Sequence, residues 1–290
     1  MHTGADASEG EDREITAKFS RDDLVRGWRE REAREPRLVP IVKFAAKTDL
    51  GRVRENNEDK FDFYEPEDRT LLATRGCLYA VADGMGGHAA GQIASELALK
   101  TLVAAYYDSP TESIPRALLE AIQCANETVF AVAHTVPDRS GMGTTLTVAV
   151  LAEDRLHIGQ VGDSRAYLIR AGEIRQITHD HSWVAEQVRL GGLTEEEAEI
   201  HPWRNIITRS IGSQDTVEAD VFVEEARAGD IVVLCSDGLT GHVHADEIGR
   251  IVSGHAPSEA CRQLIELACA RGGRDNITVA VIAIRGFASD

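Results

Sequence analysis

The order of its apolar segments predicts an α+β fold for this chain of 290 residues. Residues 89–107 and 114–132 carry apolar side chains at helical spacing, whereas residues 144–177 alternate apolar and polar side chains as strands do. Strands and helices therefore come in blocks. This arrangement favours separate α and β layers over a doubly wound parallel sheet.

Residues 1–38 predict a polar N-terminal extension, because they are mixed in charge and contain few large apolar side chains. One short helix is expected there over residues 21–35, capped by Ser20 and carrying Leu24 and Trp28 on one face. The compact domain is then expected over residues 39–290.

Within the domain, the first two helical patterns are expected to pack on a sheet, with Ile93, Leu97 and Leu102 able to share one face. Turn signals at residues 153–154 and 171–172 divide the alternating stretch into the strands of an antiparallel meander. The later elements are expected to be strands over 220–223, 231–234 and 277–284 and helices over about 245–252 and 258–271.

Residues 180–212 predict a surface excursion between these blocks. A charged helical stretch ends at Gly191-Gly192, and the acidic run Glu195-Glu196-Glu197 is then expected to start a solvated helix, where the helix dipole favours negative charge.

The charge and cysteine content limit the possible partners. The chain has 48 acidic and 31 basic residues and a formal charge of -17, which argues against a nucleic-acid partner. Its five cysteines form no Cys-x-x-Cys pair, which is typical of a reducing compartment and argues against a zinc site. No run approaches the roughly 18 apolar residues of a spanning helix, and the acidic N-terminus is unlike a secretory signal. We therefore expect a cytoplasmic monomer with no membrane partner.

Four aspartates each follow an apolar run or lie beside a glycine or amide turn, and they are Asp83, Asp163, Asp237 and Asp275. Because the apolar runs predict buried strands, these carboxylates are expected to crowd around one sheet edge. Divalent cations commonly relieve such repulsion, and Mg²⁺ or Mn²⁺ takes oxygen ligands. A glycine after the aspartate lets the backbone approach closely, so the Gly84 carbonyl is also a candidate ligand.

Several separated blocks of the chain match one known family in the family's own order. The blocks are residues 48–59, Val81-Ala82-Asp83-Gly84-Met85-Gly86-Gly87, Gly143-Thr144-Thr145, Val161-Gly162-Asp163-Ser164-Arg165, Ser236-Asp237-Gly238-Leu239 and Arg274-Asp275-Asn276. From about residue 47 to 284 the chain resembles the bacterial members of the metal-dependent serine/threonine protein phosphatases of the PPM (protein phosphatase 2C) family. The resemblance implies a four-layer α-β-β-α sandwich of two antiparallel sheets flanked by helices, with residues 180–212 as a flap beside the metal cleft.

The resemblance also implies a set of metal ligands. Asp83 would bridge two Mn²⁺ or Mg²⁺ ions, the Gly84 carbonyl would bind one of them, and Asp237 and Asp275 would complete the other. Glu58 and Asp59 would hold metal-bound waters, and Asp163 would belong to a third, weaker metal site.

The implied reaction is hydrolysis of phosphoserine and phosphothreonine in proteins, including substrates of a cognate kinase. Water bridging two cations would attack phosphorus directly, without a phosphoenzyme. Arg54 holds the family's phosphate-binding position and suits a phosphate dianion, whereas Arg52 is expected on the opposite strand face or in solvent. Where many animal members carry histidine after the Asp-Gly pair this chain has Met85, so His88 or a metal-bound water is the candidate proton donor.

Two other functions stay open at this point. A non-catalytic phosphoprotein-binding protein would keep the fold, although the unbroken set of carboxylates argues against it. Another two-metal phosphoesterase would act on a nucleotide, a nucleic acid or a small phosphorylated metabolite, of which the acidic balance disfavours nucleic acid.

Other polar groups are expected to be structural. His179, Asp180 and His181 mimic a metal cluster, but hard cations prefer oxygen ligands, so we interpret all three as flap structure. The hydroxyls of Thr144, Thr145 and Ser164 have no histidine and carboxylate nearby in sequence that would make one of them a nucleophile. We interpret these hydroxyls as structural too.

Overall fold

The structure is a computed structural model that describes residues 38–86 and 89–289. The expected N-terminal extension, with its helix over 21–35, lies outside the described residues apart from Leu38, and so does His88.

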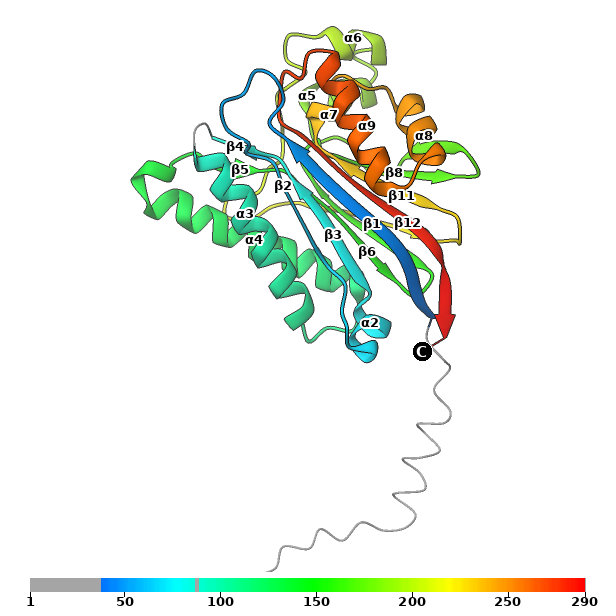
Figure 1. The fold of residues 1–290 in the computed structure, drawn as a ribbon. Coiled ribbons are helices and arrows are strands. Elements are labelled where there is room, and N and C mark those ends of the chain that lie inside the picture. Colours follow the sequence, from blue (N-terminus) through cyan, green and yellow to red (C-terminus); the bar gives the residue numbers. More distant parts are fainter. Residues whose placement is uncertain (1–37, 87–88, 290) are drawn as a thin grey trace, which may run out of the picture. The chain divides into compact units, whose positions relative to one another are not determined.

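Two five-stranded antiparallel sheets form the centre of the described domain (Figure 1). The first sheet has the order β1 (Leu38–Asp49), β12 (Ile277–Ser289), β11 (Ile231–Cys235), β8 (Arg165–Arg170) and β9 (Glu173–Gln176). The second has the order β10 (Asp220–Glu225), β7 (Arg155–Val161), β6 (Leu146–Ala152), β3 (Cys77–Ala82) and β2 (Lys60–Tyr64). A short pair joins β4 (Gly84–Met85) to β5 (Gly143–Thr144).

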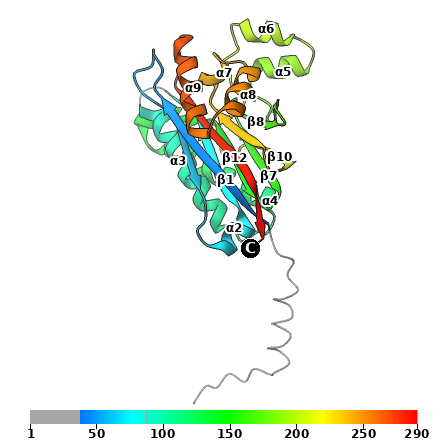
Figure 2. The same ribbon diagram turned by 45° about the vertical axis from the view of Figure 1, so that its right-hand side comes forward.

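Helices cover the outer face of each sheet, as Figures 1 and 2 show. Helices α3 (Ala89–Asp108) and α4 (Ile114–Thr135) pack on the second sheet, while α8 (Ala245–Gly254) and α9 (Pro257–Ala270) pack on the first. The shorter helices are α2 (Arg69–Arg75), η1 (Pro137–Arg139), α5 (Trp183–Arg189), α6 (Glu195–Ile200) and α7 (Asp237–Thr240). The predicted four-layer α-β-β-α sandwich is confirmed.

Strands β3 and β11 are apolar at every position because both of their faces are covered. In β3, Leu78 and Ala80 face the helices, whereas Tyr79 and Val81 belong to the core between the two sheets. Side chains alternate sides along a strand, so covering both faces requires an uninterrupted apolar run.

The predicted single meander over 144–177 was wrong in one respect. Strands β6 and β7 form one hairpin and β8 and β9 another, with positive φ at Glu153 and Ala171 in the expected turns. Between the hairpins, however, the chain leaves the second sheet and enters the first. Gly162 makes this crossing with φ of +103°, and a Cβ atom there would lie 2.6 Å from the Thr145 side chain. Alternation alone does not reveal such a change of sheet.

The excursion over 180–212 contains the two short helices α5 and α6, as expected. Thr194 caps α6 in a capping box with Glu197, and the acidic first turn is exposed. Across the described residues, helices long and apolar enough to cross a membrane are absent.

Candidate metal and phosphate site

The predicted ligand residues lie at the ends of strands from both sheets. Asp83 follows β3 of the second sheet, whereas Asp237 follows β11 and Asp275 precedes β12, both in the first sheet. The expectation of a single sheet edge was therefore wrong, since the carboxylates gather at one end of two stacked sheets.

Asp83 lies at the centre of this group of carboxylates. Asp83 is half-buried, and desolvation is the largest cause of a pKa well above the ordinary range. The neighbouring charges raise the pKa further, and these belong to Asp59, Asp237, Asp163 and Asp275. Each of these carboxylates therefore makes the ionisation of Asp83 less favourable.

The pKa values of the neighbouring carboxylates shift in the same direction. Burial, as the largest cause, raises the pKa of Asp59 to about 6, although the Ser236 hydroxyl donates to Asp59 Oδ2 at 2.7 Å. Burial followed by the charge of Asp237 raises the pKa of Asp163 to about 8. The pKa of Asp237 is raised by burial and then by Asp275. The site therefore carries more negative charge than the protein alone stabilises.

Three oxygens in this cluster are buried without a hydrogen-bond donor. They are the Oδ1 atoms of Asp59, Asp163 and Asp237. Buried polar atoms are normally paired, and free carboxylate oxygens in a repelling cluster are the donor set that Mg²⁺ and Mn²⁺ prefer. The residues thus fit the predicted cations.

The carboxylates do not form a complete cage by themselves. In the described ranges 38–86 and 89–289, no group of three or more His, Cys, Asp or Glu side chains is placed to hold a metal ion unaided. A hard cation of this kind usually takes one or two carboxylates and keeps several waters. The site therefore suits a partly hydrated ion.

Gly84 lies where no other residue fits. A Cβ atom at this position would lie 2.2 Å from the Gly91 carbonyl oxygen in α3. The Gly84 amide donates to the Glu58 carbonyl at 3.3 Å, which fixes the chain beside Asp83. Glu58 itself extends toward the same helix, because its Oε2 would lie 2.3 Å from a Cβ atom on Gly91.

Thr144 and Thr145 hold the backbone of Asp83. The Thr144 hydroxyl donates to the Asp83 carbonyl at 2.9 Å, and the Asp83 amide donates to Thr145 Oγ1, also at 2.9 Å. Thr145 Oγ1 is also 2.8 Å from Ser164 Oγ, so the turn after β7 contacts the same threonine that accepts from the Asp83 amide. These contacts agree with the structural interpretation of the three hydroxyls.

Asn276 is a positioning residue whose role the sequence reasoning missed. Its Oδ1 accepts from the Glu58 amide at 2.8 Å, and its Nδ2 donates to the carbonyls of Leu50 and Asn56 at 2.9 and 3.0 Å. One side chain thereby ties the loop of residues 50–58 to the strand start beside Asp275. The sequence signal for this role was the position of Asn276 directly after Asp275 in the Arg274-Asp275-Asn276 block.

Arg54 reaches the carboxylate cluster from this loop. Its Nη2 donates to Asp275 Oδ2 at 2.7 Å, and its side chain is 51% exposed. Arg52 is exposed to solvent, as one of the two expected alternatives had it. The strand alternation behind the other alternative was wrong, because Arg52 lies in a turn and donates its amide to the Gly273 carbonyl. The Arg54 guanidinium is thus half-exposed at the edge of the carboxylate cluster.

The His179-Asp180-His181 segment has structural partners. Asp180 accepts from Arg165 Nε and Nη2 at 3.0 and 2.7 Å, His181 pairs with Asp220, and His179 meets the edge of Phe222. These partners are consistent with the expected structural role of the segment.

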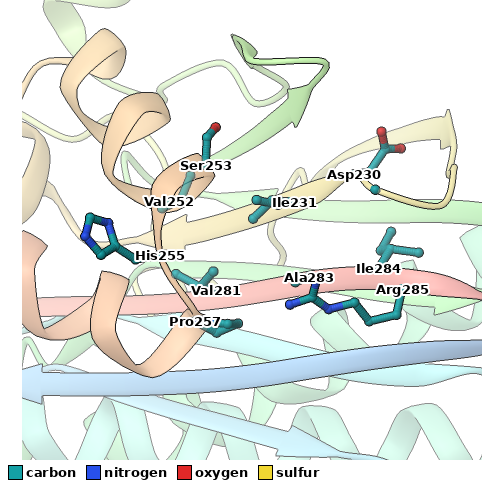
Figure 3. A pocket seen from close by; sticks show the side chains of 11 residues that line it. Asp230, Ile231, Val252, Ser253, His255, Pro257, Val281, Ala283, Ile284 and Arg285 are labelled. Carbon is teal, nitrogen blue, oxygen red and sulfur yellow. The ribbon is translucent and has the colours of Figure 1, made fainter.

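A hollow of about 210 Å³ lies elsewhere, between α8, the start of α9 and the strands β11 and β12 (Figure 3). Apolar side chains such as Val252 and Pro257 line it, and its acidic member Asp230 is already paired with Arg170 at 2.7 Å. None of the predicted site residues lines this hollow, so it has no part in the chemistry expected at the carboxylate cluster.

Comparison with known proteins identifies relatives over most of the chain. Residues 46–277 match the Protein phosphatase 2C family. The chain is 41% identical over 245 residues to the serine/threonine protein phosphatase PstP of Mycobacterium tuberculosis, a match that covers 84% of this chain and 45% of that protein. It is 40% identical over 241 residues to the serine/threonine phosphatase stp of Listeria innocua, covering 81% and 93%.

A solved structure shows the same fold. The catalytic domain of PstP, crystallised in complex with 2 manganese ions, matches with a TM-score of 0.73 and 40% identity, covering 86% of this chain and 99% of that one. The chain spans about half the length of the Mycobacterium tuberculosis relative.

Proposed function

The chain belongs to the Protein phosphatase 2C family, and on this premise we propose that it is a metal-dependent serine/threonine protein phosphatase. One observation supports this most strongly, namely the carboxylate cluster in which three buried oxygens have no hydrogen-bond donor, beside the half-exposed guanidinium of Arg54. Such a cluster suits divalent cations, and a guanidinium beside it suits a phosphate dianion.

The candidate cation ligands are Asp83, the Gly84 carbonyl, Asp237 and Asp275, with Glu58 and Asp59 holding water and Asp163 serving a third position. When bound, two Mn²⁺ or Mg²⁺ ions would activate water for direct attack on phosphorus and neutralise charge on the phosphoryl oxygens, so that no phosphoenzyme forms. The manganese ions of the PstP catalytic domain support this choice of metal.

Arg54 is our candidate for binding the phosphate. Its guanidinium pairs with Asp275 at 2.7 Å in the described structure, and the charges of Asp83 and Glu58 also raise its pKa. A planar fork of N–H donors can keep one bond to a carboxylate while it offers others to phosphoryl oxygens. Arg54 would therefore orient the ester against the repulsion of the carboxylates.

Protonation of the leaving alkoxide needs a donor. His88 remains our candidate from the sequence and lies outside the described residues. Phosphoserine and phosphothreonine proteins are the proposed substrates, on the support of relatives that are named serine/threonine phosphatases. The cytoplasm, the monomeric state and the cognate kinase remain predictions from the sequence.

The test is hydrolysis of p-nitrophenyl phosphate and of a phosphothreonine peptide by the purified chain, with Mn²⁺, Mg²⁺ or EDTA. We expect turnover that EDTA abolishes and that Asp237→Asn reduces to background. Asp246→Asn is the matched control, because this aspartate on α8 is 71% exposed and pairs only with Arg250 among the described residues. Phosphopeptide binding without turnover under any metal would favour the non-catalytic alternative.

A further inference from the structure

His181 contacts the turn that carries Asp163 through both its backbone and its ring. The His181 amide donates to the Gly162 carbonyl at 2.9 Å, and the Gly162 amide donates to His181 Nδ1 at 3.2 Å. The imidazole is buried, with 6% of the side chain exposed. This two-point contact joins residues 19 positions apart, at the change of sheet after β7.

These partners determine the tautomer of His181. An amide N–H only donates, so Nδ1 must carry the lone pair, and the proton of the neutral ring then lies on Nε2. This Nε2–H donates to Asp220 Oδ2 at 3.1 Å. Arg209 Nη1 also lies 3.3 Å from Nε2, but a guanidinium only donates, so this contact is not a hydrogen bond while Nε2 carries the ring proton. Burial is the largest cause of a lowered pKa at His181, which agrees with the neutral form. Arg209 donates to Asp220 Oδ1 at 3.1 Å and thereby orients the same carboxylate.

The Gly162 carbonyl, the Ser164 carbonyl and the Ser164 hydroxyl have partners other than the ring. Gln160 Nε2 donates to the carbonyls of Gly162 and Ser164 at 2.9 and 2.7 Å, and Ser164 Oγ contacts Thr145. In the described part of the chain, the Gly162 amide has His181 Nδ1 as its one acceptor. The ring therefore controls one specific bond, adjacent in sequence to Asp163.

His181 also closes the base of the excursion over residues 180–212. Its carbonyl accepts from the Thr208 amide at 2.8 Å, and the next residues continue the closure through the Ser182–Ile207 bridge. The entry and exit of the excursion thus meet at the residue that holds the Gly162 amide.

We propose that His181 is a positioning residue for Asp163, whose neutral ring locks the Gly162–Asp163 turn to the base of the excursion. The excursion and the Asp163 carboxylate would then keep one relative position. This role presupposes the proposed function, because it matters to catalysis only if Asp163 serves a cation. Groups that orient metal ligands from outside the coordination sphere typically affect metal affinity or activity by about 10- to 100-fold.

Two substitutions test the contributions of the two ring nitrogens separately. His181→Asn keeps an acceptor near the position of Nδ1 and loses the donor to Asp220, whereas His181→Gln keeps a donor near the position of Nε2 and loses the acceptor for Gly162. We expect the Gly162 amide to exchange with solvent about 10-fold faster or more in His181→Gln and to keep most of its protection in His181→Asn. His255→Gln, at an exposed histidine, is the control.

The functional measurement is Mn²⁺ titration by calorimetry together with kcat at saturating substrate. His181→Gln should weaken the weakest class of Mn²⁺ site by about 10-fold, and His181→Asn should restore most of the loss. Equal Gly162 exchange or equal Mn²⁺ affinity in the two variants would overturn the positioning role.

A third variant keeps the role testable if His181→Gln does not fold. Asp220→Ala removes the acceptor for Nε2–H. Arg209 Nη1, which already lies 3.3 Å from Nε2, can then donate to it, so the ring proton moves to Nδ1 and Nδ1 no longer accepts from Gly162. Faster Gly162 exchange is expected there too, and unchanged exchange would contradict the assigned tautomer. A wild-type chain that binds Mn²⁺ but turns over no phosphoester would refute the proposed function alone, because exchange and titration do not depend on turnover.

Discussion

Removing one charge from the carboxylate cluster should stabilise the metal-free protein. Asp59 is fully buried, and its pKa rises from 3.8 to about 6. A group with a raised pKa in the folded state binds more protons there than in the unfolded chain, so stability falls as pH rises between those two values. At 1.36 kcal/mol per pH unit, ionised Asp59 costs about 3 kcal/mol above pH 6.

The substitution Asp59→Asn tests this magnitude. The oxygen of the introduced carboxamide can still accept from the Ser236 hydroxyl, which contacts Asp59 Oδ2 at 2.7 Å, and its nitrogen can donate to a neighbouring carboxylate. In EDTA at pH 7.5 we expect the free energy of unfolding to rise by up to about 3 kcal/mol. The gain should fall to about half by pH 5 and vanish below pH 4, where wild-type Asp59 is protonated in both states.

Denaturant unfolding followed by tryptophan fluorescence measures this difference. Asp246→Asn, at an exposed site, should change the free energy of unfolding by no more than about 0.5 kcal/mol. With saturating Mn²⁺ the advantage of Asp59→Asn should shrink or reverse, because the cation stabilises the wild-type charges and adds binding energy to the folded state. An Asp59→Asn protein that is less stable than wild type in EDTA at pH 7.5 would refute the reasoning.

Three further predictions concern single contacts. Arg54→Ala should lower kcat/KM for a phosphothreonine peptide by about 10- to 100-fold, which corresponds to the free energy of one hydrogen bond to a charged group. An unchanged kcat/KM would exclude a phosphate-binding role. Thr145→Val should cost about 1–3 kcal/mol in thermal unfolding, because it leaves the part-buried Asp83 amide without its acceptor. A loss near zero would show that the Thr145 hydroxyl does not hold the Asp83 backbone. Gly162→Ala should lower the free energy of unfolding by at least about 2 kcal/mol, since the new Cβ would lie 2.6 Å from the Thr145 side chain. Gly172→Ala is the control, because Gly172 also has a positive φ but has open space around it, and it should cost about 1 kcal/mol. Equal losses in the two glycine variants would show that backbone conformation rather than the clash sets the cost.

Local patterns were sufficient for most of the secondary structure. Helix α4 shows an apolar face at helical spacing, and the turns at 153–154 and 171–172 occur where the sequence predicts them. Strands such as β3 were recognisable from their uninterrupted apolar runs. These signals are readable because each residue's preference depends mainly on neighbours within a few positions along the chain.

The change of sheet at Gly162 was not predictable in this way. Alternation continues on both sides of it, and a glycine beside an aspartate is equally typical of an ordinary turn. What distinguishes this glycine is the Thr145 side chain, 2.6 Å from where its Cβ would lie, and that neighbour is 17 positions earlier in the sequence.

The sequence by itself determined which residues could carry the chemistry, namely the aspartates at strand ends and Arg54. Only the tertiary structure decided that these carboxylates come from two different sheets, that three of their oxygens lack donors, and that Asn276 and His181 hold the surrounding backbone. The reason is physical. Residue type and spacing set local conformation and ligand preference, whereas burial, charge repulsion and hydrogen-bond satisfaction depend on groups that folding brings together from distant parts of the chain.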